Sequence, residues 1–207
     1  MLFRSTRLPA EDALDLARDV PARAGVLKVA VPVLPGIANF DDLDPLKLEP
    51  GVELVFVGPG TPLPGDAALV ILPGSKTTLR DLARLREEGW DIDILAHRRR
   101  GGHVLGLCGG YQMLGRSVRD PLGLEGPAGA APGLGLLDIE TELTPDKTVR
   151  EIAVEHPESG TAGRAYEIHL GVSDGPTGHA RLSASMAGRK APAAPTDGSS
   201  EPICMAS

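Results

Sequence analysis

Cysteine and aromatic residues are scarce in this 207-residue chain, which has two cysteines and 3% aromatic residues. Cys108 and Cys204 stand in unrelated contexts, so they do not indicate a disulfide framework, and such usage is typical of a reducing cytoplasm. There is no basic block, and 28 acidic against 21 basic residues give a net charge of −7. No apolar run approaches the roughly 20 residues that span a bilayer. We therefore expect a cytoplasmic protein with no nucleic-acid or membrane partner.

Short apolar runs alternate with helical stretches in the first half of the chain, where 42% apolar residues overall are enough for one globular domain. Leucines 79, 82 and 85 recur at helical spacing, and Gly89 is a plausible stop. The strands we expect are Val26–Val33, Val52–Val57, Ala67–Leu72 and Val104–Leu107, and the helices are Thr77–Glu88 and Asp91–Arg100. This order predicts an α/β fold, a parallel sheet flanked by helices, with ligands at the carboxyl ends of the strands.

Beyond Gly123 the pattern is interrupted by glycine and proline, and it indicates two more strands, Gly135–Leu143 and Ala165–Leu170. Residues 176–207 are rich in Gly, Ala, Ser and Pro without apolar periodicity, which predicts a disordered tail after a domain covering residues 25–175.

The segment VLGLCGGYQMLG places Cys108 directly after an apolar strand, with glycines at −2, +1 and +2. This is the pattern of a nucleophile elbow, in which a sharp strand-to-helix turn holds the nucleophile above the sheet. A thiol at a helix start favours thiolate, and the N–H of Gly109 can face an oxyanion. An isolated cysteine is more often a core residue, but the surrounding glycines favour a catalytic role for Cys108.

The sequence Pro73-Gly74-Ser75-Lys76 follows the preceding strand and therefore ends at the same sheet edge. Gly74 can supply a second oxyanion donor there, although these residues are equally typical of an ordinary turn at the end of a strand. The spacing of a phosphate-binding loop is absent.

A thiolate nucleophile usually needs a histidine partner, and this chain offers five candidates. His97 and His103 are expected to be solvated or capping residues, and His156 and His179 lie in polar segments. His169, on a strand-like segment, is a possible base, although a strand histidine is often packed in the core.

Together, IANFDDLDPL, PGSK and CGGYQMLG resemble the glutamine amidotransferase domain of the cobyric acid synthases, over about residues 26–175. The resemblance implies a class I, flavodoxin-like glutaminase fold. It also implies a thioester on Cys108, oxyanion donors at Gly74 and Gly109, and glutamine held by Gln112 and Ser75. Ammonia would pass to an ATP- and Mg-dependent synthetase domain that amidates a corrinoid, adenosylcobyrinic acid a,c-diamide, in cobalamin biosynthesis. No cofactor or metal is implied for this domain itself.

The sequence departs from that family in three places. Gly36 stands where the family tends to carry a basic residue. Residues 1–24 resemble the linker from a synthetase domain that is missing here. The family's C-terminal G-T-Y-x-H-G motif, with its catalytic histidine, is missing as well.

Codons permitted by residues 195–207, when two bases are skipped, can encode Asp-Gly-Arg-Val-Phe-Gly-Thr-Tyr-Met-His-Gly-Leu. We therefore hypothesise a frame shift between about Gly175 and Pro195, which would make Cys204 an artefact of frame and impair activity. The alternatives are a stand-alone cysteine hydrolase, a glutaminase partner of cobyrinic acid diamide synthase or of a cell-wall amidotransferase, and a catalytically dead binding module.

Overall fold

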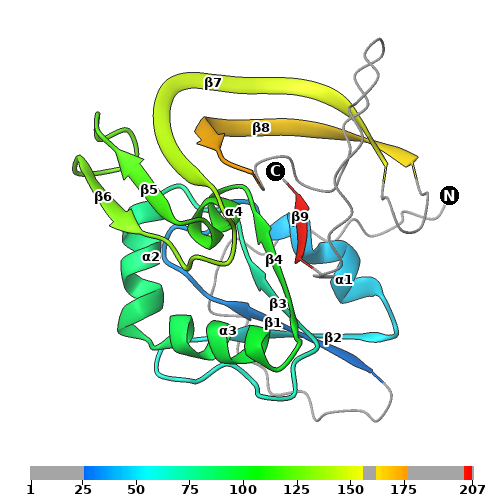
Figure 1. Ribbon diagram of the computed structural model, residues 1–207. Coiled ribbons are helices and arrows are strands. Elements are labelled where there is room, and N and C mark those ends of the chain that lie inside the picture. The colour runs from blue at the N-terminus through cyan, green and yellow to red at the C-terminus, as the bar shows by residue number, and fades with distance from the viewer. Residues whose placement is uncertain (1–25, 156–161, 177–202, 207) are drawn as a thin grey trace, which may run out of the picture.

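Five strands form a parallel sheet in the order β2-β1-β3-β4-β9 (Figure 1). The computed structural model describes residues 26–155, 162–176 and 203–206. The strand bounds are β1 Leu27–Pro32, β2 Val52–Val57, β3 Leu69–Leu72, β4 His103–Leu107 and β9 Ile203–Ala206. The first four lie where the apolar runs predicted them, which confirms a parallel α/β sheet.

Both faces of this sheet are covered because apolar residues fill successive positions of its strands. Ala30 belongs to a core shared with three helices, α2 (Thr78–Glu87), α3 (Trp90–Arg99) and α4 (Gly109–Leu114). Its neighbours Val29 and Val31 belong to a second core on the opposite face. That core includes Leu43, which lies in a 3-10 helix (η2, Phe40–Leu43) just before α1 (Asp44–Leu48). Continuous apolar runs are expected for strands buried on two faces.

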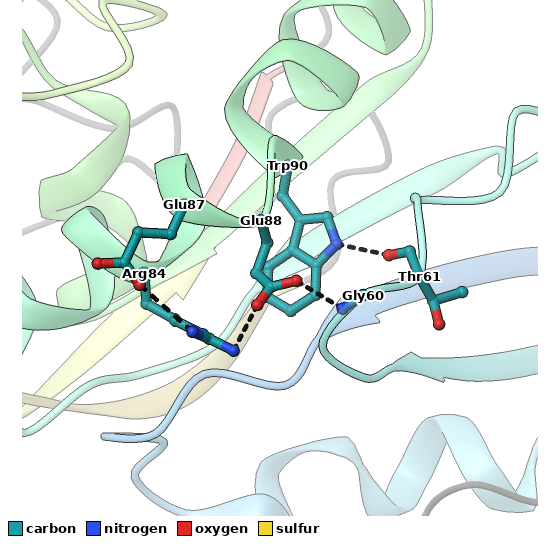
Figure 2. A network of polar contacts seen from close by, with 6 residues as sticks. All are labelled: Gly60, Thr61, Arg84, Glu87, Glu88 and Trp90. Atoms are coloured by element: carbon teal, nitrogen blue, oxygen red, sulfur yellow. Dashed lines mark hydrogen bonds and ion pairs between the residues drawn. The ribbon is translucent and has the colours of Figure 1, made fainter.

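The turn between α2 and α3 fastens the loop that leaves β2 (Figure 2). Glu88 accepts a hydrogen bond from the N–H of Gly60 and pairs with Arg84. The indole N–H of Trp90, which is fully buried, donates to the carbonyl of Thr61 at 2.8 Å. Gly89 has φ 74°, so the left-handed turn expected from a glycine stop separates the two helices.

A second sheet has the order β6-β5-β7-β8. Its strands are β5 Ser117–Asp120, β6 Gly129–Pro132, β7 Glu140–Glu155 and β8 Ala162–Asp174. Figure 1 shows β7 and β8 as a long hairpin. β5 and β6 were not expected from the sequence.

The strand predicted over Gly135–Leu143 is wrong in its first half, since β7 begins at Glu140. Leu137 and Ile139 are buried, but they lie in a loop. The backbone of that loop bonds to the end of α4: the N–H groups of Leu136 and Leu137 both donate to the carbonyl of Leu114. The loop thus satisfies carbonyls that a helix end leaves without partners.

The tail predicted to be disordered is described only at residues 176 and 203–206, and the latter form β9. For those four residues the prediction of disorder is wrong, because Val104–Leu107 pair with Ile203–Ala206 in parallel. The proposed linker, residues 1–24, lies outside the described residues, and the domain boundary at Gly175 stays a prediction. The helices found in the described ranges are too short or too polar to cross a lipid bilayer.

Candidate active site

Cys108 lies on the sharp turn between β4 and α4, as the glycine pattern predicted. Its φ of 47° and ψ of −110° are unusual for a residue with a side chain, and such backbone strain concentrates at functional sites. The glycines on each side have no room for a side chain. A Cβ on Gly106 would lie 2.6 Å from the backbone of Tyr111, and one on Gly110 would lie 2.1 Å from the carbonyl oxygen of Leu72. Cys108 is partly exposed.

The segment from Pro73 to Lys76 lies against this turn. A Cβ on Gly74 would be 3.8 Å from the Cβ of Cys108. The segment is held from its other side by a short antiparallel bridge between Ser75 and Ile37. In that bridge the N–H of Ala38 donates to the carbonyl of Gly74 at 2.8 Å. Two loops that follow β1 and β3 therefore meet beside Cys108.

The bridge also sets the direction of the Gly74–Ser75 peptide. In a trans peptide the C=O and N–H point in opposite directions, and this carbonyl faces Ala38. The N–H of Ser75 therefore faces away from Ala38, and its nitrogen is 3.0 Å from the position that a Cβ on Gly109 would take. An oxyanion donor from this segment was predicted on Gly74, and that role remains a prediction; the structure adds the N–H of Ser75 as a second candidate.

The side chain of Ser75 is engaged in hydrogen bonds within the protein. Ser75 is 6% exposed, and its hydroxyl donates to Oδ2 of Asp81 at 2.7 Å. The same hydroxyl accepts a hydrogen bond from the N–H of Thr77. Burial raises the pKa of Asp81, while hydrogen bonds from Ser75, Gly36 and Thr77 act in the opposite direction. The hydroxyl is thus engaged on both sides, and a role for Ser75 in holding glutamine remains a prediction.

Gln112, predicted to hold substrate glutamine, joins α4 to β8 in this structure. The side chain is 5% exposed, and its Nε2 donates to the carbonyl of Leu170 at 3.0 Å. A role for Gln112 in binding substrate remains a prediction. His169 precedes Leu170 and pairs with Thr148 in the hairpin. Its backbone therefore runs close to α4, but the side chain of His169 is not described, and its role as a base stays a prediction.

The N-terminus of α2 contributes residues that the sequence did not single out. The N–H of Thr78 donates to the carboxylate of Glu125 at 2.7 Å, and the N–H of Glu125 donates to Asp120 at the end of β5 at 3.0 Å. The hydroxyl of Thr78 is buried without a hydrogen-bond partner among the described residues, 3.0 Å from where a Cβ on Gly109 would lie. In sequence the pattern Thr78-x-x-Asp81 is similar to a capping box, although the residue at the helix start is Thr77. It could have drawn attention to Asp81, but the carboxylate contacts other loops instead.

Two of the remaining histidines are described. His103 is exposed, as expected. His97 was expected to be solvated or capping, and this is wrong, because the ring is 4% exposed and its Nε2 lies 2.9 Å from the carbonyl of His103. Gly102 packs against that ring. His156 and His179 lie outside the described residues. In the described ranges, no group of three or more His, Cys, Asp or Glu side chains could hold a metal ion.

The carboxyl ends of β3, β4 and β9 share one edge of the sheet. Leu72 pairs with Gly106, and Leu107 pairs with Ala206. Residues that follow these strands therefore come together at the edge where Cys108 lies. This edge is where ligands bind in open parallel sheets.

A family model described as the CobB/CobQ-like glutamine amidotransferase domain matches residues 28–203. Among curated relatives, a cobyric acid synthase of Methylocella silvestris is 58% identical over 92% of this chain and 40% of the relative. The cobyric acid synthases of Rhodobacter capsulatus and Rhizorhabdus wittichii are 63% and 61% identical, over 82% and 87% of this chain. The chain thus spans well under half the length of these relatives.

Among solved structures, PurLQS from Thermotoga maritima aligns with a TM-score of 0.52 at 22% sequence identity. The alignment covers 70% of this chain and 68% of that one. At this identity the likeness concerns the fold alone.

Proposed function

Because this chain belongs to the CobB/CobQ-like glutamine amidotransferase family, we propose that it hydrolyses glutamine through a thioester on Cys108. The observation that carries the proposal is the strained turn at Cys108, with two backbone segments closely packed around it. The class I amidotransferase fold is the scaffold on which this turn is built.

The sulfur of Cys108 attacks the carboxamide carbon of glutamine, and the electron pair of the C=O bond moves onto the oxygen. That oxygen accepts hydrogen bonds from the N–H of Gly109 and from the Gly74–Ser75 segment, where we favour the N–H of Ser75. Collapse of the intermediate breaks the C–N bond, and the nitrogen gains a proton to leave as ammonia. Water then hydrolyses the γ-glutamyl thioester to glutamate.

The proton for ammonia needs a general acid, and we propose that the chain as it stands is impaired because it lacks the family's motif histidine. β9 supports this view. In the restored frame the histidine codon spans Cys204 and Met205, in the strand that pairs with β4 and ends beside Cys108. The alternative base is His169, whose strand passes α4.

The relatives are the basis for proposing which domain receives the ammonia. We propose that ammonia is delivered to a synthetase domain like the remainder of those cobyric acid synthases. That domain would use ATP and Mg to amidate a corrinoid, adenosylcobyrinic acid a,c-diamide, in the cytoplasm.

Covalent labelling tests the proposal. A diazo-ketone analogue of glutamine should alkylate Cys108, and glutamine should slow the reaction, whereas a Cys108→Ala variant should stay unlabelled. Peptide mapping by mass spectrometry identifies the labelled residue. Preferential labelling of Cys204, with no protection by glutamine, would refute the assignment.

A further inference from the structure

A buried carboxylate in the first turn of α2 connects the two loops beside Cys108. Asp81 has no exposed surface. Both of its oxygens accept the N–H of Gly36, at 3.0 and 3.2 Å, and Oδ2 accepts the hydroxyl of Ser75 at 2.7 Å. A weaker contact at 3.4 Å comes from the hydroxyl of Thr77. Burying a carboxylate is costly unless donors surround it, and here those donors belong to the loops after β1 and β3.

The two loops form a narrow ribbon that Asp81 closes at one end. The N–H of Lys76 donates to the carbonyl of Gly36 at 2.8 Å, and the N–H of Ala38 donates to the carbonyl of Gly74. Asp81, which lies on α2, accepts hydrogen bonds from Gly36 of one loop and from Ser75 of the other. Asp81 thus bonds to both loops of the ribbon that contains the Gly74–Ser75 peptide.

The glycine at position 36 fits this arrangement. A Cβ there would lie 2.1 Å from the hydroxyl oxygen of Thr77 and 2.8 Å from Oδ2 of Asp81. A larger residue would push the carboxylate away from the N–H that it accepts. Glycine at this position thus lets Asp81 approach the loop closely.

We propose that Asp81 is a positioning residue for glutamine hydrolysis, holding the Gly74–Ser75 peptide so that its N–H meets the oxyanion formed on Cys108. The proposal rests on the glutaminase function above. The hydrogen bonds that Asp81 accepts come from the two loops beside Cys108. Its removal should therefore disturb the transition state more than the binding of glutamine itself.

The test compares two ligands. In the aldehyde analogue of glutamine, –CHO replaces the carboxamide; the sulfur of Cys108 bonds to the aldehyde carbon, and the thiol proton ends on its oxygen. Nothing leaves, so affinity reports oxyanion contacts without requiring a general acid. Asp81→Ala should weaken binding of the analogue about 10- to 100-fold, which is less than the roughly 100- to 1000-fold cost of losing a donor completely. The Kd for glutamine should change less than about twofold.

Two further variants sharpen the comparison. Asp81→Asn should recover most of the affinity, because the amide can accept from Gly36 and donate to Ser75. Glu88→Ala is the matched control, since Glu88 ends the same helix and also accepts a loop N–H, from Gly60, away from the turn. It should leave the ratio of the two affinities unchanged. Equal weakening of glutamine and aldehyde by Asp81→Ala would overturn the proposal.

Amide hydrogen exchange separates this proposal from the function on which it rests. In Asp81→Ala the amides of Ala38 and Lys76 should exchange faster, while core amides such as that of Val70 keep their protection. Unchanged exchange at both positions would refute the role of Asp81 alone. A parent protein that binds neither ligand would instead refute the glutaminase function.

Discussion

Adjacent glycines after Cys108 should respond differently to alanine, because their missing Cβ atoms face different neighbours. A Cβ on Gly109 would lie 3.0 Å from both the nitrogen and the Cβ of Ser75, a few tenths of an ångström inside ordinary contact. A Cβ on Gly110 would lie 2.1 Å from the carbonyl oxygen of Leu72, in the backbone of β3. The first change displaces a proposed oxyanion donor, whereas the second separates helix from sheet.

We expect Gly109→Ala to slow acylation of Cys108 about 10- to 100-fold, less than the 100- to 1000-fold for complete loss of one donor. Its free energy of unfolding should fall by less than about 1 kcal/mol, since the neighbours move little. Gly110→Ala requires a shift of more than about 1 Å, which costs on the order of 1–3 kcal/mol or more of stability and roughly 100-fold in rate.

The assay is the first-turnover burst of phenolate from a chromogenic γ-glutamyl ester, whose leaving group needs no proton and so does not depend on the missing histidine. Urea unfolding gives stability in parallel, and circular dichroism checks that each variant is folded. A folded Gly109→Ala variant with the burst rate of the parent would refute the role of Gly109 in acylation. A Gly110→Ala variant as stable as the parent would refute the close approach of α4 to β3.

Restoring the reading frame after Gly175 should raise ammonia release from glutamine well above that of the parent, and changing the restored histidine to Ala should abolish the gain. Robust activity of the parent that disappears in His169→Ala would contradict the frame-shift hypothesis. Burial lowers the pKa of His97, so the stability that the neutral ring contributes should be fully present above about pH 6.5 and be lost as the pH falls below it. Between about pH 7.5 and 5.5 the free energy of urea unfolding should therefore decrease less for His97→Gln than for the parent. Equal decreases in the two proteins would exclude His97 as the cause. Gln112→Ala leaves the carbonyl of Leu170 without its donor and should cost about 1–3 kcal/mol in urea unfolding, whereas an unchanged midpoint would show that α4 is held without this bond.

The parallel sheet could be predicted because its signals are local. The first three strands are apolar runs followed closely by glycine or proline, and the fourth runs directly into Cys108 and its glycines; α2 shows leucine spacing and a glycine stop. β6, with the sequence GAAP and mostly exposed residues, carries no such signal. The segment before Glu140 misled because its buried residues Leu137 and Ile139 alternate as in a strand, although N–H groups of this segment bond to the end of α4.

The elbow was predictable for the same reason, since Cys108 and its glycines are contiguous in sequence. Asp81 was not, because its donors lie on loops after β1 and β3, which are neighbours in the sheet but not in the chain. Even the capping-box pattern at Thr78 pointed to a different contact. The bond from the N–H of Gly36, 45 positions away, depends on tertiary structure alone.

The position of β9 has a consequence for folding during synthesis. β4 lies between β3 and β9, and its pairing with β9 joins segments nearly half the chain apart. Until residues 203–206 have left the ribosome, the strand that leads to Cys108 has a row of unpaired backbone groups along one side. Such an edge can pair with another chain, so synthesis that stops before this late segment endangers solubility as well as chemistry.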